Sequence, residues 1–314
     1  MTEAPRSAFS VGGGEVQAFN DGHFARLRDK HKVHPSFLEK FDIGSLRLFG
    51  GKGGNPMAFT ADKRYLVKEI NTGDHGSMLK HTLAIVEHQL TANSLICPIF
   101  LHFELSRKTY VVMRNVLPSG TGVIWHKKYD LKGNRDDKLL EEDGSDVVEV
   151  HKRCFHLHTC WYGCDAIPFL TTVARKRYYE GKKHAFETQF VTSDVQAAQI
   201  IAMINGDTQV FSAVGVMDYS LVVGILRQGE HEPIPPADGL NQFVISYGGW
   251  TYIYYMGIID FLQEWTSTKK IAALIKAPLA PKPLSTVPPV QYAQQFAVAF
   301  QQKFGGEKAA IVRI

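Results

Sequence analysis

The amino-acid sequence predicts an α+β fold divided into two lobes, the first of which is built on an antiparallel sheet. Three observations carry this prediction. Short apolar segments typical of strands surround one helical pattern in the first part of the chain, a proline-glycine segment follows at 117–120, and helical patterns then mix with apolar strands. We expect four parts: a flexible N-terminus over 1–20, an N-lobe over 21–120, a C-lobe over 121–304 and a tail over 305–314.

The composition is that of a globular protein, with 314 residues of which 45% are hydrophobic and 21% are charged. A net charge of +4 predicts no general affinity for nucleic acid, so any basic surface must be local. Four clustered cysteines do not form a secreted disulfide framework, and residues 1–14 lack a signal-peptide pattern. The longest apolar window, 243–262, contains glycines and polar residues that fit buried strands better than a membrane helix. We expect a cytoplasmic protein that can dock on the cytosolic face of a membrane; its oligomeric state stays open, a homodimer included.

A glycine-rich turn separates two predicted strands at 46–49 and 57–60. Glycines let backbone amides approach a phosphate because no side chain stands in the way. The spacing fits neither of the common nucleotide-binding glycine patterns, so a plain hairpin is the alternative. The turn comprises Gly51, Lys52, Gly53 and Gly54.

The next predicted strand, 65–70, places Lys68 on the same face as Leu66 and Ile70. If this face is the inner one, the ammonium group points at the core and needs an anionic partner; on an edge strand it would lie in water. A helix predicted over 77–92 offers Glu87 as that partner. A glycine turn followed by an inward lysine is the combination by which kinases hold ATP phosphates.

Two carboxylates, Asp218 and Asp260, each stand alone in an apolar stretch of the C-lobe, 210–226 and 252–262. Burying an unpaired carboxylate costs several kcal/mol, so each must be neutralised, paired or kept for chemistry. Because both lie at the ends of apolar strands, they suggest a metal-binding or proton-transfer pair.

Other C-lobe segments leave alternatives open. The histidines and cysteines of 151–164 could bind zinc, but their spacing is irregular, and reduced thiols beside ordinary histidines are the alternative. Ser193 is expected to cap a helix that stops at Asn205-Gly206. Lysines and prolines predict a basic loop over 263–284, which an amphipathic helix over 292–304 follows.

Several of these segments resemble the phosphatidylinositol phosphate kinases, and the resemblance extends over roughly residues 35–304. The matching words are Tyr129-Asp130-Leu131-Lys132-Gly133 for (F/Y)DLKG, Met217-Asp218-Tyr219-Ser220-Leu221 for MDYSL, Gly257-Ile258-Ile259-Asp260 for GIID, Gly51-Lys52-Gly53-Gly54 for GKSGS, and Val67-Lys68 for the nucleotide-lysine strand. The resemblance implies a two-lobed lipid-kinase fold, distantly similar to protein kinases, in which the N-lobe binds the nucleotide. It also implies an enzyme that transfers the γ-phosphate of ATP to a phosphatidylinositol monophosphate with the help of Mg²⁺.

The resemblance also implies roles for individual residues. Asp218 would orient the inositol hydroxyl and accept its proton, Asp260 would bind Mg²⁺, and Asp130 and Lys132 would lie near the phosphates. Lys68 would grip the ATP phosphates beside the glycine turn, and Met113, Asn115 and Val116 would contact adenine. An activation loop is expected over 261–290, where Lys269 and Lys270 would meet the lipid surface, and Arg135 is a candidate for gripping the substrate phosphate.

The sequence departs from the family pattern after Gly133, where Asn134-Arg135-Asp136-Asp137 replaces the usual GST and basic residues. This departure motivates an alternative, a phosphoinositide-binding scaffold with little or no kinase activity; a soluble small-molecule kinase is another. Ala272, Tyr129 and Arg114-Asn115-Val116 are similar to the branch that acts on the 5-phosphate as a 4-kinase. Use of the 3-phosphate stays open, as does the choice between a 4-kinase and a 5-kinase.

Overall fold

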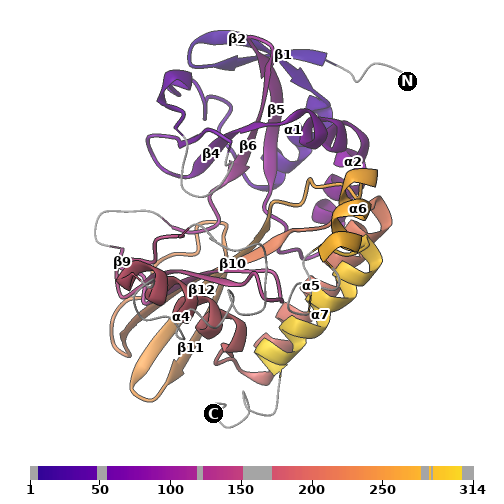
Figure 1. Ribbon diagram of the computed structural model, residues 1–314. Coiled ribbons are helices and arrows are strands. Elements are labelled where there is room, and N and C mark those ends of the chain that lie inside the picture. Colours follow the sequence, from indigo (N-terminus) through magenta and orange to yellow (C-terminus); the bar gives the residue numbers. More distant parts are fainter. Residues whose placement is uncertain are drawn as a thin grey trace. The chain divides into compact units, whose positions relative to one another are not determined.

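The computed structural model describes residues 6–47, 55–118, 123–150, 172–276, 283 and 286–305. The chain divides into two compact units, Met1–Val123 with Leu262–Glu264, and Ile124–Phe261 with Trp265–Ile314. Each unit contains one six-stranded antiparallel sheet with helices (Figure 1). This architecture confirms the predicted α+β class.

The first unit is a sheet with strand order β1-β2-β5-β6-β4-β3. Its strands are β1 (Arg6–Val11), β2 (Gly14–Phe19), β3 (Met57–Phe59), β4 (Tyr65–Ile70), β5 (Ile99–Leu105) and β6 (Lys108–Arg114). Helices α1 (Asp21–Lys30) and α2 (Thr72–Thr91) pack against each other, and a short 3₁₀ turn, η1, covers Ile43–Ser45. One hydrophobic cluster joins the sheet to both helices through residues such as Leu27, Val67, Val86 and Phe100.

The structure corrects the prediction of a flexible N-terminus over 1–20, because β1 and β2 form a hairpin there. Gly12 and Gly13 turn the chain with φ values of 61° and 75°, a region that favours glycine. Val16 and Ala18 alternate toward the core and are buried at 3% and 0% exposure. The hairpin continues the sheet because β2 pairs with β5.

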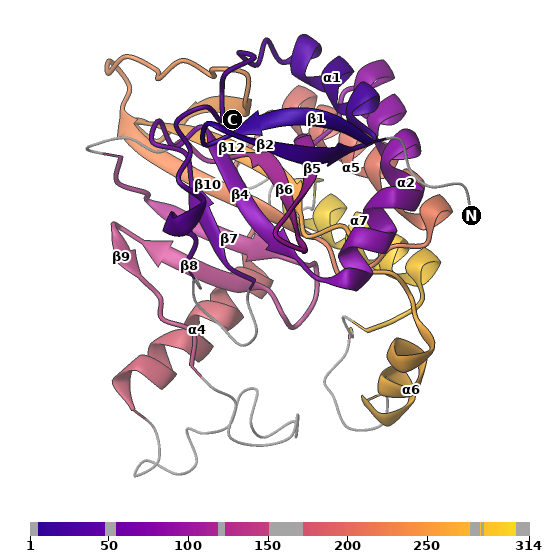
Figure 2. The same cartoon turned by 90° about the horizontal axis from the view of Figure 1, so that it is seen from above.

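The second unit is a sheet with strand order β11-β12-β10-β7-β8-β9. Its strands are β7 (Lys127–Leu131), β8 (Lys138–Glu142), β9 (Ser145–Asp146), β10 (Ser220–Gly229), β11 (Asn241–Tyr247) and β12 (Trp250–Ile259). Helix α4 (Val173–Glu187) packs on β7 and β8 (Figure 2). Helix α5 (Asp194–Val214) packs along α7 (Pro289–Gly305) (Figure 1).

One helix prediction in this unit is wrong in extent. Helix α5 begins with the predicted cap, a capping box between Ser193 and Gln196, but it continues past Asn205-Gly206 to a left-handed Gly215. The buried residues Asp207, Thr208 and Phe211 lie on its packed face, and this packing overrides the local stop signal. Residues 210–214 are therefore helical, and the apolar strand begins only at β10.

The basic segment expected as a loop over 263–284 contains a helix, α6 (Ser267–Lys276). The prolines that argued against a helix lie after it, the first at position 278. Across the described ranges we find no helix with the length and apolarity needed to cross a bilayer.

Candidate active site

Three neighbouring strands of the second sheet bring the predicted catalytic residues to one end of that sheet. Strand β10 begins at Ser220, opposite the last residue of β12, and its next residue lies opposite the last residue of β7. Asp218 stands just before β10, Asp260 directly follows β12, and Lys132 directly follows β7. The antiparallel register therefore gathers these three positions from distant parts of the sequence.

Lys132 and Asp218 form an ion pair at this end of the sheet. The lysine Nζ donates to Oδ1 of the Asp218 carboxylate and, at 3.0 Å, to the main-chain carbonyl of the same residue. The Lys132 side chain is 20% exposed and that of Asp218 is 32% exposed. The pair is thus partly shielded from water, yet the carboxylate stays accessible to a substrate.

Opposing effects set the charge of Lys132. Burial of the ammonium group lowers the pKa of Lys132, but neighbouring carboxylates, above all that of Asp218, raise it by more. The net shift is upward, so Lys132 stays protonated at neutral pH. It supplies a positive charge at the site and does not act as a proton acceptor.

Asp130 adds a carboxylate from within β7, and its Oδ1 is buried without a hydrogen-bond partner among the described residues. Such an oxygen is normally satisfied by a donor, by water or by a cation. No cluster of three or more His, Cys, Asp or Glu side chains suited to a metal occurs in the described part of the chain. Mg²⁺ usually takes one or two carboxylates together with water and substrate phosphates. The buried oxygen of Asp130 is therefore the kind of ligand that Mg²⁺ accepts.

Both strand-end aspartates have an unusual backbone conformation. Asp218 has φ 67° and Asp260 has φ 58°, in the left-handed region. This region is unfavourable for most residues with a side chain, although aspartate enters it more readily than most. Backbone outliers of this kind cluster at functional sites when the surrounding structure holds them in place.

Buried aromatic rings hold the backbone next to both aspartates. Tyr219 and Phe261, the residues that follow them, contact the ring of Phe211 on α5, with centroid distances of 4.5 and 5.4 Å. Tyr219 also packs against Tyr292 and Phe296 of α7, at 4.7 and 4.9 Å. One aromatic cluster therefore fixes the chain at both carboxylates.

The predicted nucleotide lysine, Lys68, lies in the first unit on β4, between β3 and β6. The hydrophobic cluster packs on the opposite face of this strand, through Tyr65 and Val67. Because β4 is an internal strand, the edge-strand alternative is wrong. Lys68 is partly exposed on the other face of an internal strand.

Glu87 does not pair with Lys68 as the sequence suggested. Its carboxylate forms a two-point ion pair with the guanidinium group of Arg26 on α1. This contact belongs to the packing of α1 against α2.

The predicted adenine-contacting residues follow one another at the end of β6. Met113 is 7% exposed, and Val116 is partly buried. The Asn115 side chain donates to the carbonyl of Lys63 at 2.9 Å and accepts the amide of Leu117 at 3.3 Å, which fixes the chain after β6. The glycine turn, Gly51, Lys52, Gly53 and Gly54, lies outside the described residues, as does the candidate zinc segment 151–164.

The predicted substrate-contacting cations lie on separate elements of the second unit. The guanidinium group of Arg135 stacks over the Phe186 ring at the end of α4, 4.0 Å from its centroid. Lys269 and Lys270 lie on α6, where Lys269 is partly exposed and Lys270 is exposed.

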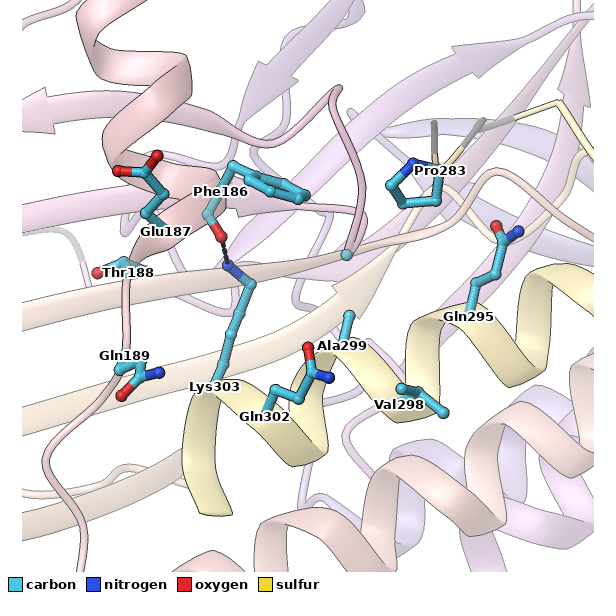
Figure 3. A pocket seen from close by; sticks show the side chains of 11 residues that line it. Phe186, Glu187, Thr188, Gln189, Pro283, Gln295, Val298, Ala299, Gln302 and Lys303 are labelled. Atoms are coloured by element: carbon cyan, nitrogen blue, oxygen red, sulfur yellow. Dashed lines mark hydrogen bonds between the residues drawn. The ribbon is translucent and has the colours of Figure 1, made fainter. Parts of the chain in front are cut away.

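A cavity of about 440 Å³ lies beside the turn that follows Lys132. Residues from this turn, the end of α4 and one side of α7 form its walls (Figure 3). Its lining is Gly133, Phe186, Glu187, Thr188, Gln189, Pro283, Gln295, Val298, Ala299, Gln302 and Lys303.

Two buried charges were not predicted from the sequence, Asp137 and Lys303, and Lys303 lines this cavity. Their groups are in contact, with Oδ2 of the aspartate 3.3 Å from Nζ of the lysine. A signal for Lys303 was present, because it is a lone lysine on the apolar face of the predicted closing helix. Asp137 gave no signal, since it stands in a run of charged residues.

Comparison with known proteins matches the family model "Phosphatidylinositol-4-phosphate 5-Kinase" to residues 45–243 and 244–303. "Phosphatidylinositol 4-phosphate 5-kinase 3" of Arabidopsis thaliana is 24% identical over 87% of this chain and 43% of its own length. "Phosphatidylinositol 5-phosphate 4-kinase type-2 gamma" of Danio rerio is 24% identical over 87% of this chain and 73% of its own length. "1-phosphatidylinositol 3-phosphate 5-kinase FAB1" of Saccharomyces cerevisiae is 23% identical over 81% of this chain and 10% of its own length. The chain thus spans less than half of the Arabidopsis relative, and the names of the three relatives refer to three different monophosphates.

Proposed function

Because the chain belongs to the phosphatidylinositol-4-phosphate 5-kinase family, we propose that it transfers the γ-phosphate of ATP to an inositol hydroxyl of a phosphatidylinositol monophosphate. The observation that carries this proposal is the Lys132–Asp218 ion pair at the end of β10, beside the position of Asp260. In phosphoryl transfer the protein mainly positions the reactants and neutralises the charge on the transferred phosphate, and it contributes little covalent chemistry.

In the proposed reaction, Asp218 accepts a hydrogen bond from the attacking hydroxyl and takes its proton. Its carboxylate is accessible enough for this role, and the bond from Lys132 holds it in one orientation. The ammonium group of Lys132 also offsets negative charge that gathers on the transferred phosphate.

Lys68 of the first unit is proposed to bind ATP phosphates, and Met113, Asn115 and Val116 to bind the adenine. Asp260 and the buried oxygen of Asp130 would hold Mg²⁺. When bound, this ion would supply positive charge that offsets the negative charge developing on the phosphates.

The lipid substrate would be met at a membrane surface. Lys269 and Lys270 reach solvent from α6, and a lysine close to an anionic bilayer contributes about 1 kcal/mol to binding. Arg135, stacked on Phe186, is proposed to contact the phosphate already present on the inositol ring.

The test offers the protein each of the three monophosphates in vesicles with Mg²⁺ and γ-labelled ATP, and identifies the labelled bisphosphate. The product fixes both the substrate and the hydroxyl that is phosphorylated. Asp218→Asn should lower turnover by at least about 10²-fold, because it removes the proton acceptor but keeps the shape of the side chain. The matched control is Asp143→Asn, a carboxylate of the same unit that is 64% exposed and pairs with His126.

Full turnover in Asp218→Asn would refute the role of this carboxylate. Vesicle binding without any labelled product from the unmodified protein would instead favour the scaffold alternative. Labelling of soluble head groups but not of vesicles would point to a small-molecule kinase.

A further inference from the structure

The turn that carries Lys132 is held by one buried side chain, Asp137. Oδ1 of Asp137 accepts the main-chain N–H of Lys132 at 2.7 Å and that of Asn134 at 3.2 Å. Asp137 is 0% exposed, so water does not compete for these bonds. The carboxylate therefore fixes the main chain on both sides of Gly133.

The second oxygen of Asp137 connects this turn to α7. Oδ2 lies 3.3 Å from Nζ of Lys303, whose side chain is only 6% exposed. Nζ also donates to the carbonyls of Ala185 and Phe186, both at 2.8 Å, and Figure 3 shows the bond to Phe186. The lysine thus joins α7 to the end of α4 and to Asp137.

A second contact with α7 comes from Gly133, which has φ +69°. A Cβ atom at this position would lie 2.7 Å from Cβ of Ala299, closer than side chains approach each other. The turn therefore rests directly on α7, and its backbone conformation favours glycine.

Stability alone does not account for this arrangement. A buried ion pair pays a desolvation penalty, and well-packed apolar residues in its place are often as stable or more stable. Lysine also has a long side chain with several rotatable bonds, so its ammonium group is placed accurately only if its main chain is fixed. The bonds of Asp137 fix that main chain.

We propose that Asp137 is a positioning residue, which aims Lys132 at Asp218 by anchoring the turn after β7 to Lys303 of α7. The inference rests on the proposed phosphoryl transfer for its consequence in catalysis, whereas the anchoring itself does not depend on that activity. Asp137 touches neither substrate nor phosphate in this role, and it acts through Lys132.

Two double variants distinguish the hydrogen bonds of Asp137 to the main chain from its ion pair with Lys303. Asp137→Asn with Lys303→Met removes both buried charges but keeps a side-chain oxygen for the N–H of Lys132. Asp137→Leu with Lys303→Met has nearly the same shape and lacks that oxygen. Both avoid an unpaired buried charge, and Glu141→Gln, which breaks the Lys128–Glu141 pair between β7 and β8, is the matched control for loss of an ion pair.

The expected result is a split in turnover between the two double variants. The Asn variant keeps kcat within a few-fold of the unmodified protein, whereas the Leu variant loses about 10²-fold in kcat, since a misplacement of about 1 Å has that effect. KM for ATP changes little in either double variant. The activity of the control Glu141→Gln also changes little. Equal kcat values in the two double variants, both folded by circular dichroism, would overturn the proposal.

Amide hydrogen exchange supplies a readout that needs no kinase activity. The Lys132 amide should exchange at least tenfold faster in the Leu variant than in the Asn variant, while the β10 amides exchange alike in both. Equal exchange at Lys132 would overturn the anchoring even if the protein phosphorylates no lipid. Absence of product from the unmodified protein would refute the proposed function. The exchange rates of the Lys132 amide in the two double variants would then still test whether Asp137 anchors the turn.

Discussion

Gly133→Ala tests the contact between the turn after β7 and α7. Two costs follow from the structure. An alanine at φ +69° loses roughly 1–2 kcal/mol to left-handed strain, and its Cβ, 2.7 Å from Cβ of Ala299, adds about 1–3 kcal/mol of overpacking. We therefore expect the free energy of unfolding to fall by about 2–5 kcal/mol.

Urea unfolding followed by tryptophan fluorescence measures this loss in the second unit, because all four tryptophans of the chain belong to that unit. Ala299→Gly removes the methyl group that would clash, at a cost of about 1 kcal/mol as a glycine within a helix. The double variant should therefore recover the overpacking but not the backbone strain, which gives a coupling energy of about 1–3 kcal/mol. If the losses in free energy of unfolding of the two single variants simply add in the double variant, the predicted contact is refuted. An unchanged urea midpoint in Gly133→Ala would refute both the backbone strain and the overpacking.

Two further predictions concern the pH dependence of the first unit and the lipid surface. Burial, followed by the charge of nearby His75, lowers the pKa of His102 from 6.5 to about 3, so below pH 6.5 the unfolded chain binds a proton that the folded chain does not. His102 should contribute about 2 kcal/mol to the fall in the free energy of unfolding between pH 7.5 and pH 5, measured by urea titrations followed by circular dichroism. A His102→Leu variant whose stability falls as steeply as that of the unmodified protein would contradict this cause. Lys269→Glu with Lys270→Glu should lower turnover on anionic vesicles by about 30-fold or more, and much less on a soluble inositol head group. Equal losses on both substrates would exclude a membrane-docking role for α6.

The sequence predicts best where local pattern and tertiary environment agree. The strand over 65–70 was predicted with its observed bounds, because alternation and flanking turns both specify it. Asp218 and Asp260 stood out as single charges in apolar stretches, and the strand register then brought them to one end of the sheet. Their neighbour Lys132 was identified only through a sequence motif of the family, because the residues around it in the sequence are densely charged.

The predictions that failed depended on tertiary packing. The stop signal Asn205-Gly206 is overridden because α5 continues along α7, and the N-terminal hairpin forms because β2 pairs with β5. The pairing of Glu87 with Arg26 and of Asp137 with Lys303 could not be read from the sequence either. Each pair joins residues far apart in the chain, and a charged side chain carries no local sign of its partner.

The acids that follow Gly133 motivated the scaffold alternative, and the structure gives them another explanation. Asp137 is buried against Lys303, and Oδ1 of Asp136 lies 3.7 Å from Nζ of Lys182 on α4. Each of the two aspartates therefore lies close to a lysine on a helix, so together they add little uncompensated negative charge to the turn. Since Asp137 also accepts a hydrogen bond from the main-chain N–H of Lys132, the departure from the family pattern has a structural role in holding this turn.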